Sequence, residues 1–137
     1  MRRIWLIAAA LLAITVTLFA KDDKMINRGP APAAQGTIHT DKDRNGNTKI
    51  EVEVKHIATP QKLSPPHQYY EVWVQDRNGQ AQPLGELRVN GDDAAGSVKG
   101  TTPAKVFDVF ITAEDQRNPS APSGPEILRG QVDRTGD

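Results

Sequence analysis

Apolar and charged side chains alternate most regularly in residues 48–56. The apolar positions are Ile50, Val52 and Val54, and a Lys or Glu stands on either side of each. Successive side chains of a β-strand point to opposite faces, so this pattern predicts a strand with one face in a core and the other in water. A half-buried strand of this kind is typical of an antiparallel sheet.

Residues 69–74 concentrate both tyrosines, one of the two tryptophans and two valines in six positions. These residue types favour strands, and we expect this segment to be the central strand of the core. Residues 105–112 carry apolar side chains on both faces. A strand buried on both sides is either central or lies beneath a crossing loop.

Shorter strands are expected at 36–40, 83–89, 96–100 and 127–132, of which 96–100 has the weakest pattern. The Asn45-Gly46 and Asn78-Gly79 pairs are typical of tight hairpin turns, and the strands up to Asp93 should follow one another as a meander. The expected fold is all-β: an antiparallel β-sandwich of immunoglobulin-like size, with about seven strands, over residues 36–137.

The N-terminus has a different character from this domain. After Met1-Arg2-Arg3, the chain has no charge from Ile4 to Ala20. As a helix this run reaches ~25 Å, which suits a short membrane anchor or a long signal-peptide core. The cleavage signal at Leu18-Phe19-Ala20 is poor because Leu18 is bulky, which favours an uncleaved anchor in residues 1–20 over a signal peptide.

The leading arginines place the N-terminus in the cytoplasm by the positive-inside bias, so the rest of the chain should be extracytoplasmic. It would be anchored to the cell membrane through residues 4–20, or exported to the periplasm or outside if the segment is cleaved. Residues 21–35 are rich in Pro, Ala and charge. We expect them to form a disordered linker.

Beyond Ala20 the chain has 15 basic and 17 acidic residues, since two of its 17 basic residues are Arg2 and Arg3. This balance offers no electrostatic footprint for nucleic acid. The absence of cysteine excludes disulfides, thiolate metal sites and thiol catalysis.

Four short motifs occur in an order that resembles the C-terminal extracytoplasmic domain of the anti-sigma-K factor family. They start at Tyr70-Glu71-Val72-Trp73-Val74, Pro83-Leu84-Gly85-Glu86-Leu87, Phe107-Asp108-Val109-Phe110 and Pro122-Ser123-Gly124-Pro125. The resemblance covers roughly residues 36–132 and implies a β-sandwich that senses or contacts envelope components.

The family carries a cytoplasmic sigma-binding domain before its membrane helix, whereas only Met1-Arg2-Arg3 precede the apolar run in this sequence. The resemblance therefore does not imply that this chain binds a sigma factor directly. Function belongs to sites rather than to folds, so anti-sigma activity is not carried over.

The turn that starts at Asp41 places oxygen ligands at Asp41, Asp43 and Asn45, with Gly46 after them, as in the first half of a calcium loop. The second half departs from that pattern, because Glu51 comes one position too early and the chain continues as a strand. We expect a solvated hairpin turn and no metal, with these three residues as the candidate ligands if a cation binds.

No catalytic constellation is visible. The three histidines, His39, His56 and His67, have no metal-ligand spacing, and no Gly-x-Ser-x-Gly elbow is present. Glu71 and Glu114 are the carboxylates with the most apolar neighbours, which could raise a pKa. We expect no enzyme activity and no cofactor.

The remaining question of recognition concerns Tyr69 and Trp73. The pattern favours Trp73 as a core residue; if it were exposed together with Tyr69, that face would be a binding surface. The leading hypothesis is a non-enzymatic envelope module whose partner is another envelope protein. The alternative is a small exported metal-binding protein, with calcium at residues 41–47, or an enzyme.

Overall fold

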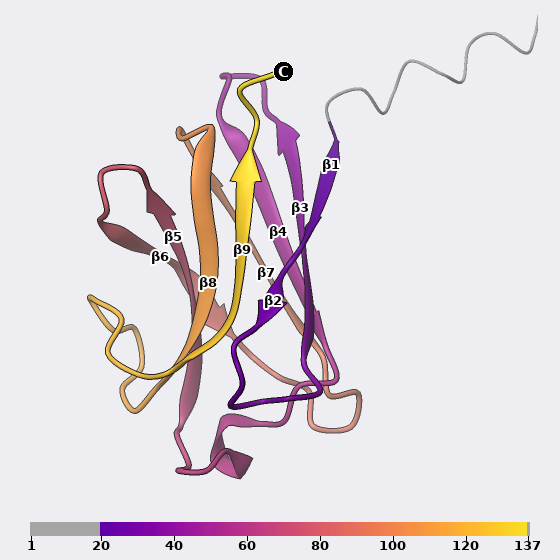
Figure 1. Cartoon of the computed structure of the whole chain (residues 1–137), viewed down its shortest axis with the longest axis vertical. Helices are drawn as coiled ribbons and strands as arrows, with labels where there is room; N and C mark the ends of the chain where they lie inside the picture. The colour runs from indigo at the N-terminus through magenta and orange to yellow at the C-terminus, as the bar shows by residue number, and fades with distance from the viewer. Residues whose placement is uncertain (1–19, 137) are drawn as a thin grey trace, which may run out of the picture.

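The computed structural model describes residues 20–136, which form two antiparallel sheets that face each other across a common core (Figure 1). The strands of these residues are β1 Lys21–Lys24, β2 Ile26–Asn27, β3 Gln35–Lys42, β4 Thr48–Lys55, β5 Tyr69–Asp76, β6 Ala81–Leu87, β7 Gly96–Thr102, β8 Val106–Glu114 and β9 Glu126–Asp133, with one turn of 3-10 helix, η2, at Pro60–Lys62. The prediction of an all-β antiparallel fold is confirmed for this part of the chain.

The strand order is β1-β3-β4-β7 in one sheet and β2-β9-β8-β5-β6 in the other. Strands β3 and β4, β5 and β6, and β8 and β9 form hairpins, whereas the chain changes sheets between β4 and β5, β6 and β7, and β7 and β8. The predicted meander is therefore wrong after the first hairpin. The β3-β4 hairpin lies in one sheet and the β5-β6 and β8-β9 hairpins lie in the other, so their apolar faces cover one another across the core.

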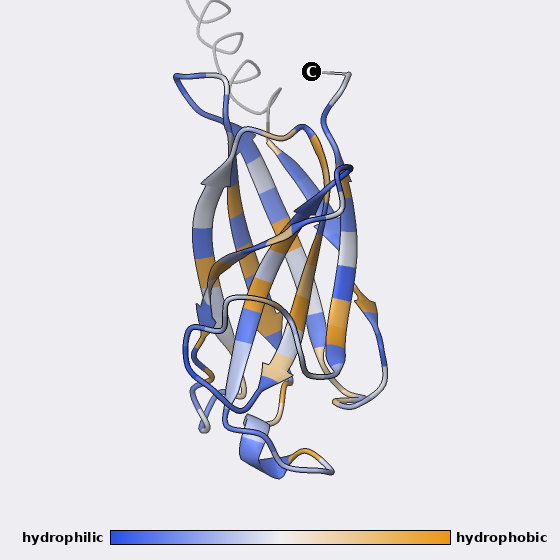
Figure 2. Ribbon diagram, turned by 90° about the vertical axis from the view of Figure 1, so that its left-hand side faces the viewer, coloured by the Kyte–Doolittle hydropathy of each residue, from blue (hydrophilic) through white to orange (hydrophobic). Residues whose placement is uncertain are grey.

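Alternation along the strands builds the core, as predicted. In β4 the side chains of Ile50, Val52 and Val54 are buried, while those between them face outward. Val109 and Ile111 of β8 are fully buried on the inner face of the opposite sheet. The resulting bands of apolar and polar residues are visible along the ribbons in Figure 2.

Two turns use glycine where the backbone needs a positive φ. Gly46 has φ +82° and Gly79 has φ +86°, a region that suits a residue without a Cβ atom. The preceding asparagines are not in this region. The hairpin at residues 41–47 is closed by Asp43, whose backbone N–H donates to the Asn47 carbonyl at 2.9 Å.

The predicted disordered linker at residues 21–35 is wrong, because strands β1 and β2 lie within this segment and pair with the sheets. Strand β1 pairs with β3 at the edge of one sheet. Strand β2, which starts two residues after β1 ends, pairs with β9 at the edge of the other sheet. Two strands are thereby added to the seven expected. Ala31 and Ala34 are also buried.

Backbone hydrogen bonds explain why the composition of residues 21–35 led to the wrong prediction of a disordered linker. The N–H of Met25 donates to the Gly36 carbonyl at 2.9 Å, and that of Arg28 donates to the Ile127 carbonyl at 2.9 Å. The Asn27 side-chain amide donates to the carbonyls of Ala31 and Ala34 at 2.8 and 3.0 Å. Strands β3 and β9 supply partners that a count of apolar residues does not reveal.

The predicted N-terminal apolar helix lies outside the described residues, apart from Ala20. Within residues 20–136, no helix has the length and apolar character needed to cross a membrane.

A proline at position 25 tests whether the segment is a strand or a tether. Met25→Pro removes the N–H that bonds to Gly36, so we expect it to lower the free energy of unfolding by about 2 kcal/mol more than Met25→Ala, which keeps that N–H. Chemical denaturation of both variants measures the difference. Equal stabilities for the two variants would restore the tether interpretation.

Candidate functional site

The outer face of the five-stranded sheet holds four of the residues singled out from the sequence, namely Tyr69, Glu71, Trp73 and Glu114. Trp73 is fully buried there, on the opposite side of β5 from the core residues Val72 and Val74. Its indole Nε1–H donates to the Thr112 hydroxyl at 2.8 Å, and its ring stacks on Phe110 with centroids 6.4 Å apart and planes 20° apart. Trp73 is thus buried, as favoured, but against this outer face rather than between the sheets.

Tyr69 lies on the same face and is only half-buried. The guanidinium of Arg117 stands 5.0 Å from the centre of its ring and 3.3 Å from the Glu86 carboxylate. Tyr69 and Trp73 therefore do not form one exposed recognition surface, because only the tyrosine reaches solvent.

Burial of this face comes from the loop at residues 115–125, which joins β8 to β9. Figure 1 shows the loop folded back beside β5, β6 and β8, and Figure 2, which looks onto this side, shows it crossing in front of the sheet. Strand β8 is the middle strand of the sheet and also lies under this loop. Its apolar pattern on both faces is therefore explained both by its central position and by the crossing loop. Strand β5, expected to be central, stands one place nearer the edge.

Glu114, at the end of β8, fixes the loop. Its carboxylate accepts hydrogen bonds from the Ser123 hydroxyl at 2.6 Å, the Ser123 N–H at 3.1 Å, the Gly124 N–H at 3.2 Å and the Thr112 hydroxyl at 2.5 Å. Glu114 is only 2% exposed. Burial alone raises the pKa of Glu114, but the bonds from Ser123, Thr112 and Gly124 outweigh it and lower that pKa below 4.5.

Glu71 occupies the same face without such donors. It is 3% exposed, and none of the side-chain hydrogen bonds found among residues 20–136 involves its carboxyl. Burial raises the pKa of Glu71 to about 7, with further contributions from the charges of Glu86 and Glu114. Two buried glutamates on one face therefore have pKa values shifted in opposite directions, because only one of them has donors.

Arg129 completes the network beside the aromatic pair. Its guanidinium carbon lies 4.2 Å from the centre of the Phe110 ring, and its N–H groups donate to Glu126 at 2.6 and 2.8 Å and to Asp108 at 2.6 Å. These acceptors make the arrangement self-contained. It is a packed polar layer rather than a cleft.

The opposite surface, the outer face of the four-stranded sheet, is open. His39 stands near its middle, with Nδ1 2.6 Å from Asp22 Oδ1 and Nε2 3.4 Å from Glu53 Oε2. The hydrogen bond to Asp22 is the main cause that raises the pKa of His39 above 6.5. A hollow of about 690 Å³ lies on one side of His39 and another of about 440 Å³ on the other.

The candidate calcium turn is an ordinary hairpin turn in its hydrogen bonding. The Asp43 carboxylate oxygen Oδ1 accepts the N–H groups of Asn45 and Asn47, each at 2.8 Å, and Asp41 Oδ1 accepts the Lys42 N–H at 2.8 Å. These bonds use carboxylate oxygens that a cation would need. In the described part of the chain, no three His, Cys, Asp or Glu side chains are grouped so as to hold a metal ion.

The histidines stay apart from one another. His39 has carboxylate neighbours, His67 Nδ1 lies 3.0 Å from Asp115 Oδ1, and His56 is exposed on a turn with φ +58°. His67 Nε2 is buried and has no hydrogen-bond partner among residues 20–136.

Sequence reasoning missed the partners of the carboxylates. It singled out Glu71 and Glu114 but not Ser123 and Gly124, which bind Glu114 from nine and ten residues away. The available signal was the Pro-x-Gly-Pro segment, since a glycine between prolines often marks close backbone approach. The pairing of His39 with Asp22 was hidden by the expectation that Asp22 belonged to a linker.

Compared with protein-family models, with curated proteins and with solved structures, the chain matches none of them.

Gly124, the single glycine of residues 115–125, should be sensitive to substitution. A Cβ atom there would lie 1.6 Å from the Ala113 carbonyl oxygen, a backbone atom, so Gly124→Ala should lower the free energy of unfolding by about 3 kcal/mol or more. Gly91→Ala is the control, because nothing lies within 4 Å of the Cβ position at Gly91. Thermal and chemical denaturation should show a change within about 0.5 kcal/mol for the control. Similar losses in both variants would contradict the close packing of Gly124.

Proposed function

We propose that this protein is a non-enzymatic, extracytoplasmic β-sandwich of immunoglobulin-like size that binds another envelope protein and uses no cofactor. The facing of the two sheets and the shared core support the sandwich description. The uncharged run from Ile4 to Ala20 behind two arginines supports the extracytoplasmic placement, as a membrane anchor or a cleaved export signal.

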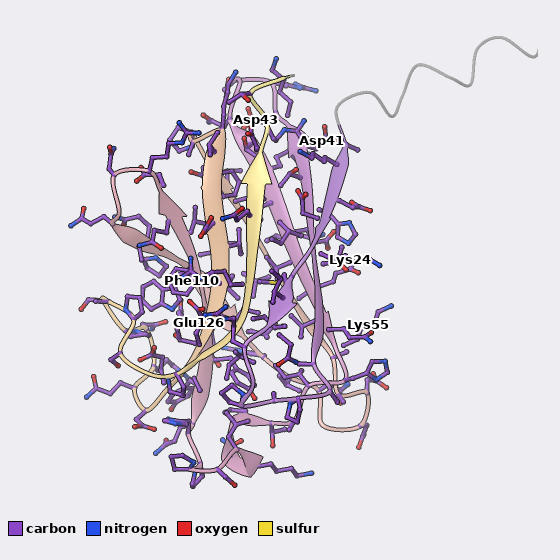
Figure 3. The ribbon with its side chains drawn as sticks, in the orientation of Figure 1. Lys24, Asp41, Asp43, Lys55, Phe110 and Glu126 are labelled. Atoms are coloured by element: carbon purple, nitrogen blue, oxygen red, sulfur yellow. The ribbon has the colours of Figure 1, made fainter. Side chains whose placement is uncertain are left out.

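The observation that carries the proposal is the open outer face of the four-stranded sheet. Side chains of both signs alternate over all four strands, and no loop within residues 20–136 is hydrogen-bonded across them. The charged members are Asp22, Lys24, Asp41, Lys49, Glu51, Glu53, Lys55 and Lys99. Figure 3 shows Lys24, Asp41 and Lys55 on this side of the molecule and Phe110 and Glu126 on the other.

The two outer faces of the domain differ in a way that favours this assignment. The outer face of the five-stranded sheet is covered by residues 115–125, and Glu114 and Arg129 find their hydrogen-bond partners within the domain. The outer face of the four-stranded sheet is hollowed on both sides of His39 and presents charges that a partner surface can match. Alternating charges of this kind set partner specificity and orientation more than raw affinity.

The resemblance to the anti-sigma-K factor domain supports the class of the fold in the proposal. The four motifs that carry it fall on β5, β6, β8 and on the loop and strand that follow, all in the five-stranded sheet. In this proposal the five-stranded sheet is a scaffold that supports the four-stranded sheet. We propose no direct binding to a sigma factor.

The placement outside the cytoplasm is tested by a C-terminal fusion to alkaline phosphatase, which becomes active only where its disulfides form. We expect an active fusion from the full chain and an inactive one when residues 2–20 are deleted. Resistance of the intact chain to alkaline extraction of membranes would indicate the anchor rather than the cleaved signal. An inactive full-length fusion would contradict the extracytoplasmic placement.

The binding face is tested by photo-crosslinking in cells. A crosslinking amino acid at Lys99, on the open face, should give an adduct of one defined mass, whereas the same group at Gln131, exposed on the other sheet, should not. Glu51→Lys should reduce the Lys99 adduct by about tenfold because it reverses one charge of the face. Arg88→Glu, an exposed reversal outside the face, should leave the yield unchanged. Equal labelling from Lys99 and Gln131 would rule out this surface.

A further inference from the structure

The strongest inference beyond this function concerns Glu71 and the loop above it. Glu71 stands directly opposite Glu86 on β6 and Thr112 on β8, and Glu114 is the next outward-facing residue along β8. The Thr112 hydroxyl is engaged, since it accepts from Trp73 and donates to Glu114. No group on either neighbouring strand therefore offers a hydrogen bond to the Glu71 carboxyl.

The loop at residues 115–125 is attached at the two glutamates that flank Glu71. Ser123 and Gly124 bind Glu114, and Arg117 pairs with Glu86 at 3.3 Å. The Ala113 N–H also donates to the Pro125 carbonyl at 3.0 Å. A charge on Glu71 would thus appear between both attachment points, on a residue that is only 3% exposed.

We propose that Glu71 makes this loop a pH-sensitive latch, which is closed over Trp73 and Phe110 while Glu71 is neutral and is loosened when Glu71 carries its charge. The physical reason is that a lifted loop admits water to the carboxylate and relieves its repulsion from Glu86 and Glu114. The latch does not depend on the proposed binding face, which belongs to the other sheet.

The other charged groups near the latch do not cancel the repulsion of an ionised Glu71 from Glu86 and Glu114. Arg117 could attract an ionised Glu71, but its side chain is 55% exposed and already paired with Glu86, so its attraction is weakened by solvent. Arg88, also near Glu86, is 80% exposed. On β9, Arg129 is bonded to Glu126 and Asp108. At the start of the loop, Asp115 contacts His67.

The direction of the pH dependence follows from linkage. With the loop closed, burial holds the pKa of Glu71 near 7, and with the loop open that pKa returns toward its ordinary 4.5. Opening should therefore become easier as pH rises from about 4.5 to about 7, and should change little above that range. Glu114 acts in the opposite sense at lower pH, because its protonation as pH falls below 4.5 weakens the bonds to Ser123 and Gly124.

Hydrogen exchange of residues 115–125, measured by mass spectrometry on the intact chain, tests the latch. After correction for the intrinsic pH dependence of exchange, we expect the opening equilibrium to rise by about fifty-fold between about pH 5 and about pH 8. Glu71→Gln should abolish this rise. Glu53→Gln, on the opposite face, should leave it intact. A corrected opening equilibrium that is flat in the parent chain, or an unchanged rise in Glu71→Gln, would overturn the proposal.

Two further measurements keep the test decisive if Glu71→Gln does not fold. In a Trp5→Phe background, Trp73 is the sole tryptophan, and its quenching by acrylamide should increase over the same pH range. Ser123→Ala removes one bond to Glu114 but no titrating group, so it should increase exchange of the loop at every pH while keeping the pH-dependent rise. Quenching of Trp73 that is independent of pH, or loss of the rise in Ser123→Ala, would count against Glu71 as the controlling group.

Discussion

Strand β8 is buried on both of its faces, and this double burial shapes most of the molecule. Inward, Val109 and Ile111 pack against the four-stranded sheet. Outward, Phe110, Thr112 and Glu114 lie beneath residues 115–125. A chain with only seven aromatic residues gains a second apolar layer in this way, but every polar group taken into that layer must find a partner or pay a cost in free energy.

The two buried glutamates show both outcomes of that requirement. Glu114 is stabilised by donors from its own strand and from the returning loop, so its burial is compatible with a charge. Glu71, one strand away, has no such donors, so burial favours its neutral acid and raises its pKa to about 7. An unsatisfied carboxyl of this kind lowers stability and makes the layer responsive to pH, which is the basis of the proposed latch.

The domain therefore separates its two outer surfaces by chemistry. One carries a closed aromatic and polar layer, in which Trp73, Phe110 and Arg129 contact one another or share neighbours. The other carries alternating charges around His39 and remains open to solvent. Strand β1 belongs to this surface, so the segment after Ala20 is part of the proposed binding face rather than a spacer behind it.

Several features were determined by the sequence alone. The alternation around Ile50, Val52 and Val54 specifies which face of β4 is buried, because a strand has a two-residue period whatever its partners are. The apolar pattern on both sides of β8 predicted that both of its faces are buried. The Asn-Gly pairs located two hairpin turns through the need for positive φ at glycine.

The tertiary structure decided what local pattern cannot encode. Residues 21–27 are strands because sheet edges offer them hydrogen bonds, although their own composition resembles a linker. Trp73 faces outward, as the alternation along β5 predicts. It is buried there only because the loop at residues 115–125, distant in the sequence, covers it. The different fates of Glu71 and Glu114 likewise depend on Ser123 and Gly124, since donors brought together by folding, rather than neighbours in sequence, determine whether a buried carboxyl keeps its charge.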